Sequence, residues 1–239
     1  MKAKEIIEYL RQPVFIENRN STKFKDKVKG VIITYLFYLP PFFCSVFLLF
    51  LVDKLLVQHF YDYSILEQLS ANRLELKNKY GIYTFLVVVL IGPFLEEIIF
   101  RLPLTLKKTA IALSITLLVY RFVGGHFFSF NFQEVSGYVR LGIAICTMFI
   151  IIKFLPFTWL AALKQKSFNY FFYGSAFVFA LMHISNFSPY NYQVYLFYPL
   201  YTLPQLVMGL FIGYIRMKYG FISGWGLHAL INLPSVLLG

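Results

Sequence analysis

The stretch Gly92-Pro93-Phe94-Leu95-Glu96-Glu97-Ile98-Ile99-Phe100-Arg101 places two adjacent carboxylates and an arginine inside an otherwise apolar run. An ionisable side chain at bilayer depth costs about 2.5 to 3.5 kcal/mol on insertion scales, so this group needs a structural or functional reason. On a helix, Glu97 and Arg101 are four residues apart and share one face, while Glu96 points about 100° away. We therefore expect Arg101 to pair with Glu97 and Glu96 to face something else. A buried ion pair that only fixes helix packing is the alternative for this stretch taken alone.

The composition indicates an integral membrane protein. Of the 239 residues, 59% are hydrophobic and 14% are charged, and the mean hydropathy is +0.66. A soluble globular chain is about half apolar and about a quarter charged. The net charge of +11 does not indicate nucleic-acid binding, because eight of the 22 basic residues fall in the first thirty positions and most others lie in short connectors between apolar runs. That distribution is typical of membrane topology.

Apolar length predicts an all-α polytopic membrane protein. About seven transmembrane helices are expected to form one bundle with a polar intramembrane cavity, all within a single domain over residues 31–239. The predicted spans are 31–52, 82–105, 109–123, 138–160, 168–187, 193–215 and 221–238.

The polar ends and connectors set the expected orientation. Residues 1–30 are predicted to form a polar, cytoplasmic lead-in, because the basic residues favour an N-terminus on the inside. Ile6 and Leu10 belong to an apolar stripe that would lie on the membrane surface, and a disordered tail is the alternative. Asp53 and Asp62, which follow the first span, are expected in a solvated outside loop.

A second group of polar residues lies inside the later spans. His183 follows Phe179 by one helical turn, and His228 precedes Asn232 by one turn, so that each pair shares a face. Because lipid-exposed polar groups are so costly, these side chains must face the interior of the bundle. We expect them to meet one another and the carboxylate of Glu96 there.

Three motifs, each inside an apolar span, follow one another along the chain: Glu96-Glu97-x-x-x-Arg101, Phe179-x-x-x-His183 and His228-x-x-x-Asn232. In this order they resemble the signature of the CAAX protease and bacteriocin-processing (CPBP, Abi) family, which includes the eukaryotic CAAX prenyl endopeptidases. The resemblance covers about residues 82–238. It implies an intramembrane glutamate endopeptidase that uses no metal or other cofactor.

The resemblance also implies a role for each motif residue. Glu96 and His183 would activate a water molecule, and His228 and Asn232 would form the oxyanion hole. Amide hydrolysis needs both a base for water and donors where the carbonyl oxygen becomes negative. The remaining motif residues would support these catalytic ones: Glu97, Arg101 and Phe179.

The chain departs from the family pattern in the long interval between its first two motifs. Residues 109–163 look like an inserted helical pair, whose loop carries His126 and Glu134. Such an insertion bears on the substrate more than on the chemistry. The expected partner is a membrane-associated peptide or protein tail, and a prenylated CAAX-type tail, a bacteriocin precursor and a pheromone precursor all remain open.

Three alternatives use the same residues differently. Glu96, His183 and His228 are suitable ligand types for a zinc enzyme, although the chain has no HExxH motif. Intramembrane glutamate, arginine and histidine also build proton relays in transporters, which would make the protein a non-enzyme. The third alternative is an immunity-type or scaffold protein in which the motifs serve packing alone.

Overall fold

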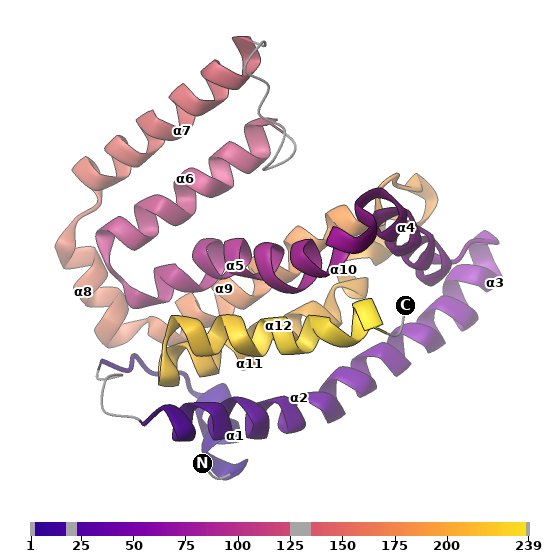
Figure 1. Ribbon diagram of the computed structural model, residues 1–239, viewed down its shortest axis with the longest axis horizontal. Coiled ribbons are helices and arrows are strands. Elements are labelled where there is room, and N and C mark those ends of the chain that lie inside the picture. Colours follow the sequence, from indigo (N-terminus) through magenta and orange to yellow (C-terminus); the bar gives the residue numbers. More distant parts are fainter. Residues whose placement is uncertain (1–2, 18–22, 125–134, 238–239) are drawn as a thin grey trace.

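The computed structural model describes residues 3–17, 23–124 and 135–237, and within these ranges the chain is helical with no strand (Figure 1). The α-helices are α1 (Ala3–Arg11), α2 (Phe24–Val52), α3 (Gln58–Tyr61), α4 (Ile65–Tyr80), α5 (Gly92–Glu96), α6 (Lys108–Gly124), α7 (Val135–Phe154), α8 (Phe157–Lys166), α9 (Phe168–Met182), α10 (Tyr198–Tyr201), α11 (Leu203–Tyr219) and α12 (Phe221–Leu237). His126 and Glu134 lie outside the described residues.

Helix α11 forms the centre of the bundle. Helices α2, α9 and α12 pack against it, and side chains on all sides of its C-terminal half are buried. Ile212 and Ile215 are fully buried there. A helix that is apolar all round needs partners on every face, which explains the central position of α11.

Helices α6 and α7 pair with each other and extend away from this bundle (Figure 1). Much of the surface of α7 is apolar and exposed, with Phe149 at 70% and Ile150 at 56%. A polar contact joins the two helices, in which Arg140 Nε donates a hydrogen bond of 2.7 Å to the Tyr120 carbonyl. Helices therefore form in the region that the sequence marks as an inserted pair, and its origin as an insertion stays a prediction.

The expected seven membrane crossings are not all recognisable from the length of the described helices. Three described segments are long and apolar enough to cross a bilayer, namely Phe24–Tyr61, Val135–Phe154 and Tyr192–Tyr219. A pair bent by 102°, Ile65–Tyr83 with Leu86–Thr105, would make a fourth. The other predicted spans correspond to helices of 15 to 17 residues, α6, α9 and α12. The protein is an integral membrane protein with an all-helical fold, and the seven-span count is not confirmed.

Two polar segments are placed differently from the expectations. The lead-in packs on the bundle, because α1 lies against α11 and both Ile6 and Tyr9 are buried in the main core cluster. Asp53 is 1% exposed, so its assignment to a solvated loop was wrong. It accepts hydrogen bonds from Ser64 Oγ (2.6 Å) and Tyr201 Oη (2.7 Å), and these partners compensate for its burial.

Candidate active site

The first motif lies on an irregular helical segment. The π-helical turns Leu86–Ile91 and Glu97–Arg101 flank the short helix α5, and a 3₁₀ turn, Leu102–Thr105, follows. Pro93 has no N–H to donate within the segment. A Cβ on Gly92 would come within 2.9 Å of the Val87 carbonyl oxygen, so the wide turn there requires glycine. The sequence was interpreted as one regular helix, which missed these turns; π-turns are rare and are often found at functional sites.

Glu97 and Arg101 lie in the sealed part of the site. Both are 0% exposed, and Arg101 Nε is 3.8 Å from Glu97 Oε1. The same carboxylate oxygen is 3.1 Å from Nδ1 of His228, which is also fully buried. The pairing of Arg101 with Glu97 was expected from their spacing, and the contact from His228 was not.

Phe179 completes this buried group. The guanidinium carbon of Arg101 lies 3.7 Å from the centroid of the Phe179 ring, a cation–π contact in a fully buried setting. The same ring makes edge contacts with both His183 and His228, at centroid distances of 4.6 and 5.8 Å. Phe179 therefore contacts the arginine and both imidazoles and helps to fix their positions.

Glu96 faces the two histidines at the partly accessible end of the site. Its Oε2 atom is 4.0 Å from His183 Nε2 and 3.5 Å from His228 Nε2. The side chain of Glu96 is 31% exposed and that of His183 is 16% exposed. The two adjacent glutamates thus point in different directions: Glu97 into the protein, and Glu96 toward the Nε2 atoms of the two histidines, on the partly exposed side of the site.

His183 stands where α9 ends and a 3₁₀ turn, His183–Phe187, begins. Its Nδ1 atom is 2.8 Å from the Phe179 carbonyl oxygen. Because a carbonyl oxygen can only accept, Nδ1 carries the proton, and in the neutral ring Nε2 is left as an acceptor facing Glu96.

Asn232 contacts backbone in this structure. Its Nδ2 donates to the Val88 carbonyl at 3.0 Å, and Trp225 Nε1 on the same helix donates to the Leu90 carbonyl at 3.0 Å. Both acceptors belong to the π-helical turn before the motif, where backbone groups need side-chain partners in an apolar setting. Helix α12 therefore positions the first motif as well as His228. No local pattern in the sequence indicates the bond from Trp225, because its acceptor lies 135 residues away along the chain.

Two glycines allow the helices to approach the buried charges. A Cβ on Gly209 would lie 3.1 Å from an Arg101 guanidinium nitrogen, and a Cβ on Gly224 would lie 3.3 Å from Glu97 Oε2. Small residues commonly mark close helix contacts in membrane proteins. The Gly224-Trp225-Gly226 triplet carried that signal in the sequence, but it was not used.

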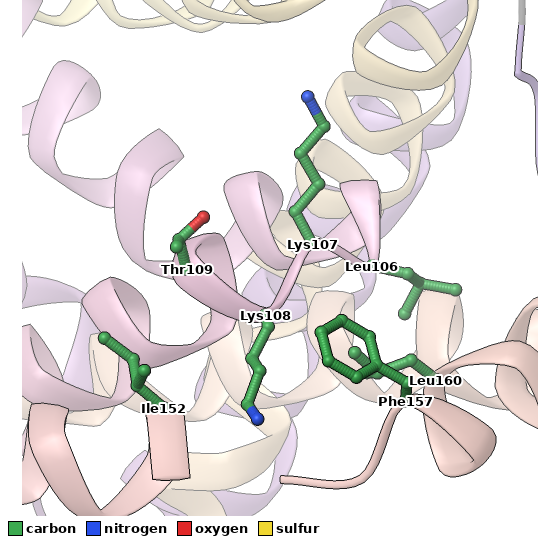
Figure 2. Close-up of a pocket in the computed structure, with 7 residues that line it drawn as sticks. All are labelled: Leu106, Lys107, Lys108, Thr109, Ile152, Phe157 and Leu160. Atoms are coloured by element: carbon green, nitrogen blue, oxygen red, sulfur yellow. The ribbon is translucent and has the colours of Figure 1, made fainter.

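One pocket of the structure is lined by residues that belong to none of the three motifs (Figure 2). It has a volume of about 670 Å³ and lies where α6 begins and α7 and α8 meet. Its lining residues are Leu106, Lys107, Lys108, Thr109, Ile152, Phe157 and Leu160. The polar cavity expected around the motifs is not confirmed. Among the described residues, no three His, Cys, Asp or Glu side chains are arranged to hold a metal ion.

The fold and these contacts define an integral membrane protein that gathers two carboxylates and two histidines, the groups that hydrolytic enzymes use, inside a helical bundle. The chain belongs to the family of type II CAAX prenyl endopeptidases, Rce1-like, whose family model matches residues 78–234. Every motif residue lies within that match, which agrees with the resemblance to the CPBP family. Comparisons with curated proteins and with solved structures give no match. The family is one of membrane proteases, and this chain is a member of it.

Proposed function

We propose that this protein hydrolyses a peptide bond in a membrane-associated peptide or protein tail, with a water molecule activated by Glu96 and His183. The observation that carries the proposal is the 4.0 Å separation of Glu96 Oε2 and His183 Nε2. This distance is too long for a direct hydrogen bond, but a water about 2.8 Å from each atom would fit between them. Both atoms would accept from that water, which leaves its oxygen lone pair free to attack a carbonyl carbon.

The partial exposure of these two side chains supports their role as the general-base pair. Water must reach the site for hydrolysis, and the sealed pair Glu97 and Arg101 offers no such access. In this mechanism Glu96 takes the proton from the attacking water and passes it to the leaving nitrogen. His183 orients the water through Nε2.

His228 and Asn232 are assigned to the oxyanion. His228 Nε2 faces the cluster without a hydrogen-bond partner among the described residues. It would donate to the developing oxyanion when the ring is protonated at both nitrogens, with Nδ1–H directed at Glu97. The Asn232 amide has a second N–H beyond the one it gives to Val88. That N–H is the second proposed donor. Glu97, Arg101 and Phe179 would fix the positions of the two histidines.

The proposed substrates are prenylated CAAX-type tails and precursor peptides of the bacteriocin or pheromone kind. We further propose that the N-terminus is cytoplasmic and that substrates enter from the cytoplasmic side. The two basic segments Lys107-Lys108 and Arg216/Lys218 would face the inside, consistent with the positive-inside rule.

The test is a cleavage screen by mass spectrometry. Purified wild type, Glu96→Gln and the matched variant Glu75→Gln, in which an exposed glutamate of α4 is changed, are incubated with prenylated and unprenylated peptides, with and without a strong chelator. The proposal expects cleavage by wild type and by Glu75→Gln, loss in Glu96→Gln, and no effect of chelator. Loss with chelator and recovery with zinc would establish the zinc alternative instead. A folded wild type that cleaves no peptide would refute the proposal.

A further inference from the structure

Two amide side chains of α4 donate hydrogen bonds to the backbone shortly after His183. Asn72 Nδ2 donates to the carbonyl oxygens of Asn186 and Ser188, both at 2.8 Å. Gln68 Nε2 donates to the Phe187 carbonyl at 2.7 Å and also to the Pro189 carbonyl. The carbonyls of four consecutive residues, 186–189, are thus held by one helix (α4 lies beside this loop in Figure 1). We call Gln68 and Asn72 the amide clamp.

The amide clamp is itself held in place. The Gln68 Oε1 atom accepts from Tyr63 Oη and, at 3.5 Å, from Tyr198 Oη, so the orientation of its amide is fixed by donors on one side and acceptors on the other. At the start of α4, the buried Asp53 carboxylate accepts from Ser64 Oγ and from Ile65 N at 3.0 Å. These bonds tie α4 to the end of α2.

The segment 186–189 needs these hydrogen bonds to keep its conformation. Chain that is neither α-helix nor strand leaves carbonyl groups without partners, and in an apolar setting each must find one. The 3₁₀ turn His183–Phe187 has weaker backbone bonding than an α-helix, so its geometry depends on outside contacts. His183 is the first residue of that turn, and the clamped carbonyls belong to residues three to six positions further along the chain.

We infer that Gln68 and Asn72 are positioning residues for the proposed reaction, because they fix the turn that sets where His183 Nε2 faces Glu96. This inference rests on the proposed function of His183. It assigns a catalytic support role to α4, which lies largely outside the matched family region of residues 78–234. The two residues are four apart, so both amides leave the same face of α4.

The test compares three variants of the full-length protein in detergent. Asn72→Leu removes both donated hydrogen bonds and keeps a side chain with the same branching and number of heavy atoms. Asn72→Asp is an isosteric second variant that turns acceptors toward the carbonyls. The matched control is Asn78→Leu, which changes an exposed asparagine on the same helix. We measure amide hydrogen exchange of peptides covering 183–190, and kcat and KM on the substrate found in the cleavage screen.

The clamp predicts that exchange over 183–190 rises about tenfold or more in both Asn72 variants and not in Asn78→Leu, because the turn opens locally. It also predicts that kcat falls about a hundredfold with KM within about twofold, since a catalytic group moved by about 1 Å loses alignment without losing substrate contacts. A purely structural role for Asn72 would leave kcat of the folded variant unchanged.

The measurements distinguish a failure of the clamp from a failure of its link to catalysis. Unchanged exchange in both Asn72 variants overturns the clamp, and faster exchange with unchanged kcat, or a change confined to KM, overturns its link to catalysis. If the wild type cleaves nothing, the proposed function fails and the catalytic role fails with it. The exchange measurement then still decides whether the clamp holds the turn.

Discussion

The guanidinium carbon of Arg101 lies over the Phe179 ring, 3.7 Å from its centroid, and both side chains are fully buried. A buried cation–π contact of this kind contributes about 2 kcal/mol. In Phe179→Leu we expect the free energy of unfolding in detergent to fall by about 3 kcal/mol, from the lost contact and the lost ring volume. Phe100→Leu is the matched control, because Phe100 is also buried but its ring centroid is 5.9 Å from the guanidinium carbon; equal losses in the two variants would contradict this account.

The two adjacent glutamates should separate activity from stability. Glu96→Gln is expected to lower the cleavage rate by about 10²-fold or more while the unfolding free energy changes little, because its side chain is 31% exposed. Glu97→Gln leaves Arg101 buried without its carboxylate, so we expect a loss of about 3 kcal/mol in stability. Rate measurements and denaturant titrations on both variants check this. If Glu96→Gln and Glu97→Gln lost the same cleavage rate and had the same unfolding free energy, the two carboxylates would not have distinct roles.

Helix α12 offers a paired test of close packing. A methyl group at Gly224 would lie 3.3 Å from both Glu97 Oε2 and Arg216 Cβ, whereas nothing lies within 4 Å of a methyl group at Gly226. Overpacking typically costs about 1 to 3 kcal/mol, so Gly224→Ala should lower the unfolding free energy by about that amount. Gly226→Ala should be neutral or stabilising by about 0.5 kcal/mol through helix propensity. A stable, fully active Gly224→Ala would show that the helices separate without cost.

Asp53 is expected to be a stability determinant. Asp53→Asn turns an NH₂ group toward the hydroxyl and amide donors that the carboxylate now accepts from, so we expect a loss of about 2 kcal/mol in unfolding free energy. The control is Asp62→Asn, since Asp62 is exposed at a φ of 49°, a conformation that asparagine also adopts. Its change should stay within about 0.5 kcal/mol. A denaturant titration that gives the two variants equal midpoints would argue against the Asp53 network.

The native cysteines report on the position of the bilayer. Cys44 on α2 and Cys146 on α7 are both exposed on the protein surface, and both lie within apolar segments long enough to cross a membrane. In intact membranes we expect neither thiol to react with a membrane-impermeant maleimide, because the reactive thiolate needs water. Both should react after solubilisation in detergent. An engineered Asn78→Cys on the charged helix α4 serves as the accessible control, and rapid labelling of Cys44 without detergent would place α2 outside the bilayer.

The meeting of the main polar residues at one site was predictable from the sequence, because charged residues in apolar spans are too costly to be accidental. That argument identified Glu96, His183 and His228, and the structure brings these three side chains together. The pairing of Glu97 with Arg101 followed from helical spacing alone. These inferences depend on residue type and local periodicity, which a sequence displays directly.

The remaining features depend on tertiary contacts that no local pattern encodes. The burial of Asp53 results from Tyr201, which is 148 residues away along the chain. The amide clamp could not be predicted from the sequence for the same reason, since Gln68 and Asn72 donate to carbonyls more than a hundred residues further along the chain. Apolar length also does not show where a helix changes to a 3₁₀ turn, as at His183.

The wide turn Glu97–Arg101 has a consequence for comparing this chain with its relatives. A π-turn is an α-helical turn that has accepted one additional residue, so losing one residue between Glu97 and Arg101 would restore ordinary helix and leave the chain after Arg101 in register. The same deletion within the regular helix α11 would rotate everything beyond it by about 100°. Length differences among homologues are therefore tolerable inside the first motif itself. In a relative that has lost that residue, an alignment with a fixed spacing would place the arginine opposite the wrong position.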